Sequence, residues 1–157
     1  MLIQFEEYLT IENIYLWSNF GVLPFWILLL LVPNSKFTQF LINSIILPLI
    51  FAVLYSYLLY QAIISDDSIV EIFELYFGLD SLYTIFANEK FLLLFWIHFL
   101  FINLFIGSWA SRDGIKYNIP RKLVAIPLIL IYFSGPVGLV LYWIFRIFYA
   151  KRLGFHE

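Results

Sequence analysis

Four long runs of apolar residues, with almost no charge inside them, dominate the chain. They cover residues 14–32, 40–64, 91–109 and 123–148. Each is long enough to form a helix across the hydrocarbon core of a bilayer, which is about 30 Å thick and takes about 20 residues. Backbone amides in hydrocarbon must bond within their own segment, and the runs lack the alternating polar positions of a membrane β-barrel. The pattern predicts an all-α fold, an integral membrane bundle of four transmembrane helices forming one domain over residues 1–157.

The connections between these runs differ in kind. Residues 33–35, Pro-Asn-Ser, are typical of a tight polar turn. The stretch 65–90 is long and acidic, yet it keeps apolar residues at helical spacing on the side opposite Glu71 and Glu74. These apolar residues are Ile69, Ile72, Phe73, Tyr76 and Phe77. We expect a helix lying in the membrane interface, with a surface cap that makes no lipid contact as the alternative.

Composition agrees with a membrane setting. The chain is 63% hydrophobic and 13% charged, whereas soluble domains carry roughly 25% charged residues. The absence of cysteine rules out disulfides and thiolate chemistry. A net charge of -2 without a basic stripe argues against nucleic acid, so the expected partner is a membrane lipid. Residues 1–13 contain three Glu and no Lys or Arg, so we expect the first run to be retained rather than cleaved as a signal peptide.

In a layout of four crossings, the basic residues divide almost evenly between the two faces. Arg146 falls on the face of the N-terminus, and Asp113 falls on the opposite face. The face of the N-terminus carries four Lys and Arg residues, and the opposite face carries five. The positive-inside rule counts Lys and Arg and largely ignores acids, so this small difference favours both termini outside only slightly.

His98 is the first candidate for chemistry. It lies about 10 Å inside the third predicted helix, where an ionisable side chain is costly and points by default to function. A neutral imidazole that bonds a neighbouring helix is the equally weighted alternative. His98 and His156 are the only histidines. Two are too few for a membrane di-iron centre, and a haem ordinarily needs an axial ligand from the protein. We therefore expect no metal and no cofactor.

Two further polar residues stand on the third predicted helix. Asn103 is five positions after His98, about 140° around the helix, so the two form no side-by-side dyad. Asn103 shares a stripe with Trp96, and an interhelical hydrogen bond is its simpler interpretation. Asp113 is the sole acid on its face, where the Asn34 turn must also lie. It is a candidate general acid or, more simply, a solvated partner of an arginine.

Prolines predict irregular backbone in two of the helices. Pro136, within Ser134–Gly138, has no amide hydrogen for the carbonyl of Tyr132, and Pro24 has the same effect on Phe20. A kink with a free carbonyl follows, and in lipid such a carbonyl must find a neighbour, water or a ligand. Trp96, Asn103, Ser134 and Asn34 are therefore the candidate pocket residues, although proline often only shapes the packing of membrane helices.

The order of several short motifs resembles one family. The motifs are Leu23-Pro24-Phe25, Pro33-Asn34, Tyr57-Leu58-Leu59-Tyr60, Trp96-Ile97-His98-Phe99-Leu100, Asn103-Leu104-Phe105 with Gly107, Trp109 and Asp113, and Phe133 to Leu139. They resemble the abscisic-acid-deficient-four-like family, whose plant members act in neoxanthin synthesis in plastids and whose many bacterial members have no established role. One position departs from the family pattern, because Asn103 stands where an Asp is usual and cannot titrate.

The resemblance implies a redox-neutral reaction. A xanthophyll epoxide would open and a ring-adjacent proton would be lost to give an allene, which needs an acid and a base but no cofactor. On this basis His98 is the candidate base and Asp113 the candidate acid. The resemblance also implies a bacterial inner membrane, or a plastid membrane for a plant-like protein.

Three functions remain, in order of preference. The first is a membrane isomerase of a carotenoid or another isoprenoid lipid, which predicts His98 at a lipid-open cavity. The second is a non-catalytic lipid-binding or assembly factor, which predicts a packed His98 and a surface for a partner. The third is a small transporter subunit, which needs a polar path that four such helices provide only as an oligomer.

Overall fold

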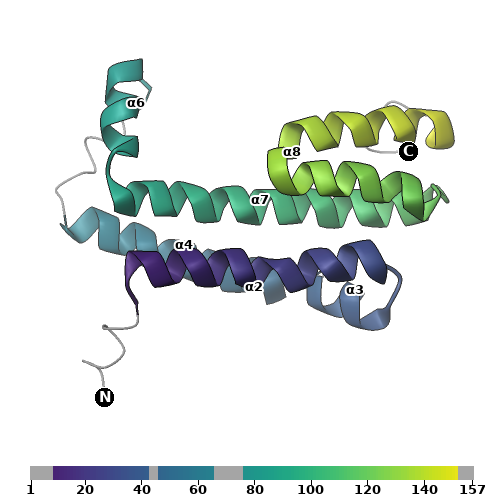
Figure 1. Ribbon diagram of the computed structural model, residues 1–157, viewed down its shortest axis with the longest axis horizontal. Coiled ribbons are helices and arrows are strands. Elements are labelled where there is room, and N and C mark those ends of the chain that lie inside the picture. The colour runs from purple at the N-terminus through teal and green to yellow at the C-terminus, as the bar shows by residue number, and fades with distance from the viewer. Residues whose placement is uncertain (1–8, 43–45, 66–75, 152–157) are drawn as a thin grey trace. The chain divides into compact units, whose positions relative to one another are not determined.

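In a computed structural model the described residues, 9–42, 46–65 and 76–151, form helices joined by turns, with no strand among them (Figure 1). The all-α prediction is confirmed. The chain divides into two compact units: unit 1 holds residues up to Phe20 and Leu49–Phe99, and unit 2 holds Gly21–Pro48 and the residues from Leu100 onward. The expectation of one transmembrane domain stays a prediction.

Unit 1 is built on the first half of α2 (Ile11–Leu31), most of α4 (Ile46–Ser65) and the start of α7 (Glu89–Lys116). Apart from Ser18, the buried side chains in its described part are aliphatic and aromatic, as the apolar runs predict. They include Ile14, Phe51, Leu58, Ile85, Leu93, Leu94 and Ile97. Within helices that are apolar all round, it is the packing between elements that selects which side chains are buried.

The second connection contains a short helix, α6 (Leu79–Phe86), whose last residue packs edge-on against Phe91 and Phe95 of α7. The sequence predicted a helix over residues 69–77 instead. Tyr76 and Phe77 lie in an exposed turn, so the prediction is wrong at these two positions. Ile69, Ile72 and Phe73 lie outside the described residues.

Unit 2 begins with the second half of α2 and the polar turn that the sequence predicted. Ser35 caps α3 (Lys36–Ile42), because its hydroxyl accepts the amide hydrogen of Thr38 at 3.0 Å. The hydroxyl of Thr38 is fully buried and donates to the carbonyl of Val32 at 2.8 Å. These bonds close the turn between α2 and α3. The described residues of the second apolar run belong to α3 and α4.

The last helix, α8 (Arg121–Ala150), reverses direction at its middle (Figure 1). Ser134 and Gly135 have non-helical backbone angles, φ −147°, ψ 38° and φ 12°, ψ −73°, directly before Pro136. The second arm then packs back on the first, since a Cβ on Gly138 would lie 2.6 Å from the carbonyl oxygen of Pro127. The predicted kink is confirmed, but it is a reversal rather than a bend in a straight helix.

The reversal corrects the predicted layout of the fourth helix. The first arm, residues 121–133, is about 20 Å long at 1.5 Å per residue, shorter than the roughly 30 Å of a hydrocarbon core. Arg146, on the second arm, comes to lie beside Asp113, whereas the sequence placed the two on opposite faces. That placement was wrong because it assumed a straight helix.

By length and composition, three described helices are long and apolar enough to cross a membrane: α2, α7 and α8. α4 contributes only a shorter apolar stretch, Leu49–Gln61. The predicted count of four spanning helices is therefore not confirmed, because α4 falls short in the described residues, and α8, although long enough, is broken at its middle. α7 runs for 28 residues without interruption.

Candidate functional site

Asn103 lies against the point where α8 reverses. It belongs to α7, its side chain is only 4% exposed, and a Cβ on Gly135 would overlap its Oδ1 atom. Only a glycine leaves room for the amide there. Asn103 and the neighbouring half-buried Ser134, both predicted as pocket residues, are thus brought to the same place.

The amide nitrogen of Asn103 has no hydrogen-bond partner in the part of the chain that the structure describes. Leaving such a donor buried and unpaired costs about 1–3 kcal/mol. Pro136, on the other side of the reversal, offers no amide hydrogen to the carbonyl of Tyr132. The site therefore combines an unused donor with irregular backbone in an otherwise apolar part of unit 2. Such an arrangement can accept an oxygen-bearing group.

The depth of this site follows from the helices. Asn103 is 13 residues before the end of α7 at Lys116, about 20 Å along the helix. The first arm of α8 has the same length, so its tip reaches the middle of α7. In membrane proteins, broken helices that end near the middle of the bilayer commonly form binding sites.

Asp113 and Arg146 form a buried ion pair near the end of α7. Arg146 Nε donates to Asp113 Oδ2 at 2.7 Å, and the two side chains are 1% and 10% exposed. The hydroxyl of Tyr142 donates to the same oxygen at 2.7 Å, and Tyr117 accepts from Arg146 Nη2 at 3.3 Å. The guanidinium also lies 4.6 Å from the ring centre of Trp143. Oδ2 of Asp113 therefore accepts two hydrogen bonds, and the cluster ties the second arm of α8 to α7.

Sequence reasoning missed Arg146 and Tyr142 as members of this cluster. A signal was present, because an arginine inside an apolar run requires a buried partner, and Asp113 was the one acid among several bases. The pairing contradicts a solvated Asp113. The role of Asp113 as a general acid stays a prediction.

His98 is exposed on α7, with its ring centre 5.9 Å from that of Tyr55 on α4. It is not packed inside unit 1, and Asp113 belongs to unit 2. The two predicted catalytic residues thus belong to different units.

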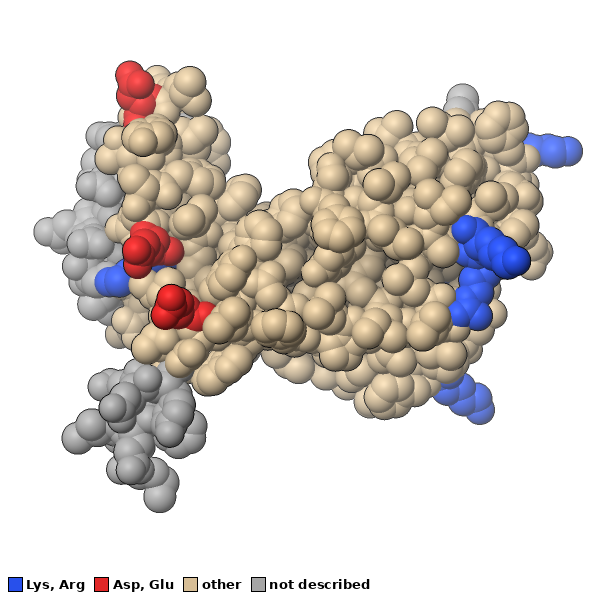
Figure 2. Space-filling model, viewed as in Figure 1, with Lys and Arg blue, Asp and Glu red and all other residues tan. Residues whose placement is uncertain are grey.

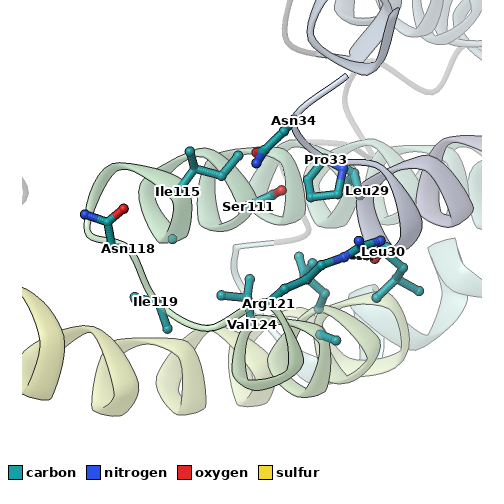
Figure 3. A pocket seen from close by; sticks show the side chains of 13 residues that line it. Leu29, Leu30, Pro33, Asn34, Ser111, Ile115, Asn118, Ile119, Arg121 and Val124 are labelled. Atoms are coloured by element: carbon teal, nitrogen blue, oxygen red, sulfur yellow. Dashed lines mark hydrogen bonds between the residues drawn. The ribbon is translucent and has the colours of Figure 1, made fainter. Parts of the chain in front are cut away.

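The remaining pocket candidates line two cavities. Trp96 lines a cavity of about 720 Å³ in unit 1, together with Tyr15 and the carboxylates of Glu12 and Glu89. Its indole nitrogen donates to Asn19 Oδ1 at 3.1 Å. Asn34 lines a cavity of about 300 Å³ in unit 2 (Figure 3). Among the described residues, no group of three or more His, Cys, Asp or Glu side chains could hold a metal ion.

Comparison with known proteins supports the resemblance seen in the sequence. The chain is 30% identical over 127 residues to Protein ABA DEFICIENT 4, chloroplastic, of Arabidopsis thaliana. This alignment covers 79% of the chain and 56% of that protein, so the chain spans little more than half the length of this relative. No solved structure matches the chain. A family model described as ABA DEFICIENT 4-like matches residues 13–142, which include Asn103 and the reversal of α8. The chain belongs to the ABA DEFICIENT 4-like family.

Proposed function

We propose that this protein spans a membrane several times and binds an isoprenoid lipid, a carotenoid or a related molecule with an oxygen function, at the reversal of α8. We further propose that it isomerises this lipid without a cofactor. α2 and α7 cross the bilayer, and α8 enters it and turns back. The family membership and the apolar helices support this proposal.

The unpaired amide of Asn103 is the observation that carries the proposal. A buried donor at mid-depth is costly unless a ligand uses it. A hydroxyl or epoxide oxygen on an apolar molecule is a suitable acceptor, while the rest of the ligand fits an apolar surrounding. The family resemblance to neoxanthin-synthesis proteins points to the same class of lipid.

The reaction would move one proton and leave the formula of the lipid unchanged. In the opening of an epoxide to an allene, one C–O bond and one C–H bond break, an O–H bond forms, and a new C=C bond forms. Asn103 would stabilise the negative charge that develops on the oxygen, as an oxyanion-hole donor does. It cannot supply the proton. His98 belongs to unit 1 and Asn103 to unit 2, so His98 as the base is a separate prediction that its own variant tests. Asp113 is bonded to Arg146 and Tyr142 and is better suited to holding the fold.

The test is the pigment and lipid profile of cells with and without this gene, by chromatography with mass detection. We expect the wild-type gene to convert an accumulated isoprenoid into an isomer of equal mass, and His98→Ala and Asn103→Leu to leave the precursor unconverted. If no isoprenoid differs between the strains, the proposed activity is wrong.

Asn103→Leu also separates binding from folding. Replacing an unpaired buried amide by an apolar group of similar size is neutral or stabilising, so the variant should keep or raise the unfolding temperature in detergent while conversion is lost. Asn19→Leu is the matched control, because Asn19 is bonded to Tyr15 and Trp96 at 2.7 and 3.1 Å. It should lower stability and retain conversion. A stable and fully active Asn103→Leu would show that the amide serves no ligand.

One observation favours a protein that binds the lipid without converting it. Asn103 cannot titrate, and Asp113 is already bonded to Arg146 and Tyr142. In that case the purified protein retains an isoprenoid through Asn103, the strains contain the same isomers, and His98→Ala behaves as wild type.

A further inference from the structure

A second cavity lies in unit 2 where α2 and α7 end and α8 begins (Figure 3). Its volume is about 300 Å³, which matches the lower end of ligand pockets in proteins, roughly 300–1,000 Å³. Leu29, Val124 and Leu128 form an apolar wall. Asn34, Ser111, Asn118 and Arg121 contribute polar side chains. The cavity thus offers both an apolar and a polar surface to one ligand.

The backbone that holds these polar groups is well determined by local bonds. α7 ends with Asn118 in the left-handed conformation, φ 52°, and the amide of Ile119 donates to the carbonyl of Gly114 at 2.9 Å. This is the usual end of a helix, with asparagine in the position that glycine prefers. The side chain of Asn118 is exposed and therefore free to serve the cavity.

Arg121 is fixed at the opposite side of the cavity. Its Nε and Nη2 atoms donate to the carbonyl of Leu30, at the end of α2, at 3.1 and 2.9 Å (Figure 3). These two bonds use part of the guanidinium, which has five N–H groups in a rigid fork. Because these bonds already hold the Arg121 side chain in place, its other N–H groups can bind a ligand in the cavity without a further loss of side-chain conformational entropy.

Ser111 supplies a buried polar group in the cavity wall. Ser111 is 4% exposed and lines the cavity from α7. Its hydroxyl, the amide of Asn118 and the guanidinium of Arg121 are the hydrogen-bond donors that the lining offers to a ligand with acceptor oxygens.

The net charge at this end of unit 2 is positive and favours an anionic ligand. Arg121 lines the cavity, and the other exposed bases in the neighbouring segments of unit 2 are Lys36, Arg112, Lys116 and Lys122. In Figure 2 no acidic side chain is visible among the Lys and Arg side chains at the end away from the red ones. Asp113, the one acid in the described part of unit 2, is neutralised by Arg146. The local potential is therefore positive.

We propose that this cavity binds the phosphate group of an anionic membrane lipid. Arg121, Asn118 and Ser111 would donate to the phosphate oxygens, and the wall of Leu29, Val124 and Leu128 would take the glycerol and the first carbons of the chains. The apolar wall favours a lipid over free phosphate as the source. The proposal rests on the membrane placement of α2 and α7 but not on the isoprenoid activity.

The experiment measures the unfolding temperature of the full-length protein in nanodiscs. One set contains phosphatidylcholine alone, one contains equal parts of phosphatidylcholine and phosphatidylglycerol, and one contains phosphatidylcholine with inorganic phosphate in solution. Native mass spectrometry of the released protein counts retained phosphatidylglycerol. We expect stabilisation and retained lipid only with phosphatidylglycerol. Equal stability in all three sets would overturn the proposal, and an equal effect of inorganic phosphate would overturn the lipid as its source.

Variants separate the cavity from general surface attraction. Arg121→Gln should weaken phosphatidylglycerol retention about fivefold, the effect of one base near an anionic surface. Because Arg121 also bonds α2, two milder variants are needed. Ser111→Ala and Asn118→Gly should each weaken retention about two- to tenfold, the range for one neutral hydrogen bond, and glycine suits the left-handed position of Asn118.

Lys122→Gln is the matched control, since Lys122 is exposed at the same end but does not line the cavity. It should change retention less than Ser111→Ala does. If Lys122→Gln has the largest effect and the cavity variants have none, the lipid is held by surface charge alone and the proposal is wrong. Isoprenoid conversion should be unaffected by Asn118→Gly, so failure of this proposal is distinct from failure of the first.

Discussion

At the scale of single residues, the buried pair of Asp113 and Arg146 shows how one charge inside an apolar chain is accommodated. The guanidinium meets the carboxylate at 2.7 Å and lies over the rings of Tyr117 and Trp143, at 4.9 and 4.6 Å from their centres. Two of the three guanidinium nitrogens, Nε and Nη2, donate to Asp113 and Tyr117. Because the pair is buried away from water, each charge is stabilised mainly by the other.

Removing one member should be far worse than removing both. Arg146→Met leaves the Asp113 carboxylate buried without its counter-ion, and breaking a buried pair in this way costs about 3–5 kcal/mol. Asp113→Leu combined with Arg146→Met removes both charges and should recover most of that loss. Thermal unfolding in one detergent, followed by circular dichroism, measures both variants against the wild type.

Arg112→Met provides the control for this pair. Arg112 is adjacent to Asp113 but exposed, and such surface substitutions usually change stability by less than about 0.5 kcal/mol. A double variant no more stable than Arg146→Met would contradict this prediction, because the loss would then come from the missing contacts of Arg146 and not from an unpaired buried charge.

Gly135 and Asn103 should behave as a coupled pair. A Cβ at position 135 overlaps the Asn103 amide oxygen, so Gly135→Ala should destabilise the protein by about 1–3 kcal/mol, as overpacking of a core does. Asn103→Ala should relieve that clash. The double variant should therefore be more stable than the sum of the single effects predicts, which thermal unfolding of the four proteins measures. Additive effects would contradict the contact.

At the scale of elements, α8 shows where sequence reasoning succeeds and where it stops. Pro136 and the two glycines around it indicated a break, because proline removes a bond and glycine tolerates unusual backbone angles. The direction of the chain after the break is a tertiary property. It depends on the close contact of Gly138 with Pro127 and on the fastening of Arg146 to Asp113, which no local pattern contains.

Cross-linking tests the reversal. In the structure Trp143, on the second arm, lies against Trp109 of α7, with ring centres 6.0 Å apart. In a straight α8, Trp143 would lie about 33 Å beyond the start of the helix, and Phe133 would be nearer to Trp109. The chain has no cysteine, so the pairs Trp109→Cys with Trp143→Cys and Trp109→Cys with Phe133→Cys can be compared with one short bis-maleimide, and both leave Asp113 and Arg146 in place. We expect the first pair to cross-link faster, as followed by mass spectrometry, and the opposite order would contradict the reversal.

The candidate site was predictable only in part for the same reason. Asn103 and Ser134 were singled out as polar residues in apolar helices, and the structure places them at one break. Arg121, Ser111 and Asn118 were not singled out, because each looks like an ordinary loop or surface residue until α2, α7 and α8 converge. Periodicity could not select the buried positions either, since helices apolar on every side have no hydrophobic stripe to read.

At the scale of the whole molecule, the reversal changes which end of the helices carries the Lys and Arg residues of the second arm. Seven Lys and Arg residues of unit 2 now belong to the end where α7 stops and α8 starts and finishes: Lys36, Arg112, Lys116, Arg121, Lys122, Arg146 and Lys151. In the described part of unit 1, Lys90 is the one base, beside the acids Glu12, Asp80 and Glu89. An uneven distribution of bases is what the positive-inside rule uses to decide orientation.

We therefore predict that the loop between α7 and α8 faces the cytoplasm in a bacterial host. Lys122→Cys should react with a membrane-impermeant maleimide in inverted vesicles and not in intact spheroplasts, as measured by gel shift. Ala87→Cys, before the start of α7, should show the reverse pattern. Labelling of both positions from one side would mean that α7 does not cross, and a complete inversion would mean that charge does not set the orientation.

The reversal of α8 also changes the number of times that the chain crosses a bilayer. A hydropathy profile assigns one crossing to Arg121–Ala150, because its 30 residues are apolar enough to span. A segment that enters and returns contributes none, so the parity of the crossings shifts by one. Whatever is attached beyond Lys151, a reporter enzyme or an affinity tag, would then emerge in the same compartment as the α7–α8 loop. A protein that docks on the C-terminal end of α8 should be sought there, and not in the compartment that the profile indicates.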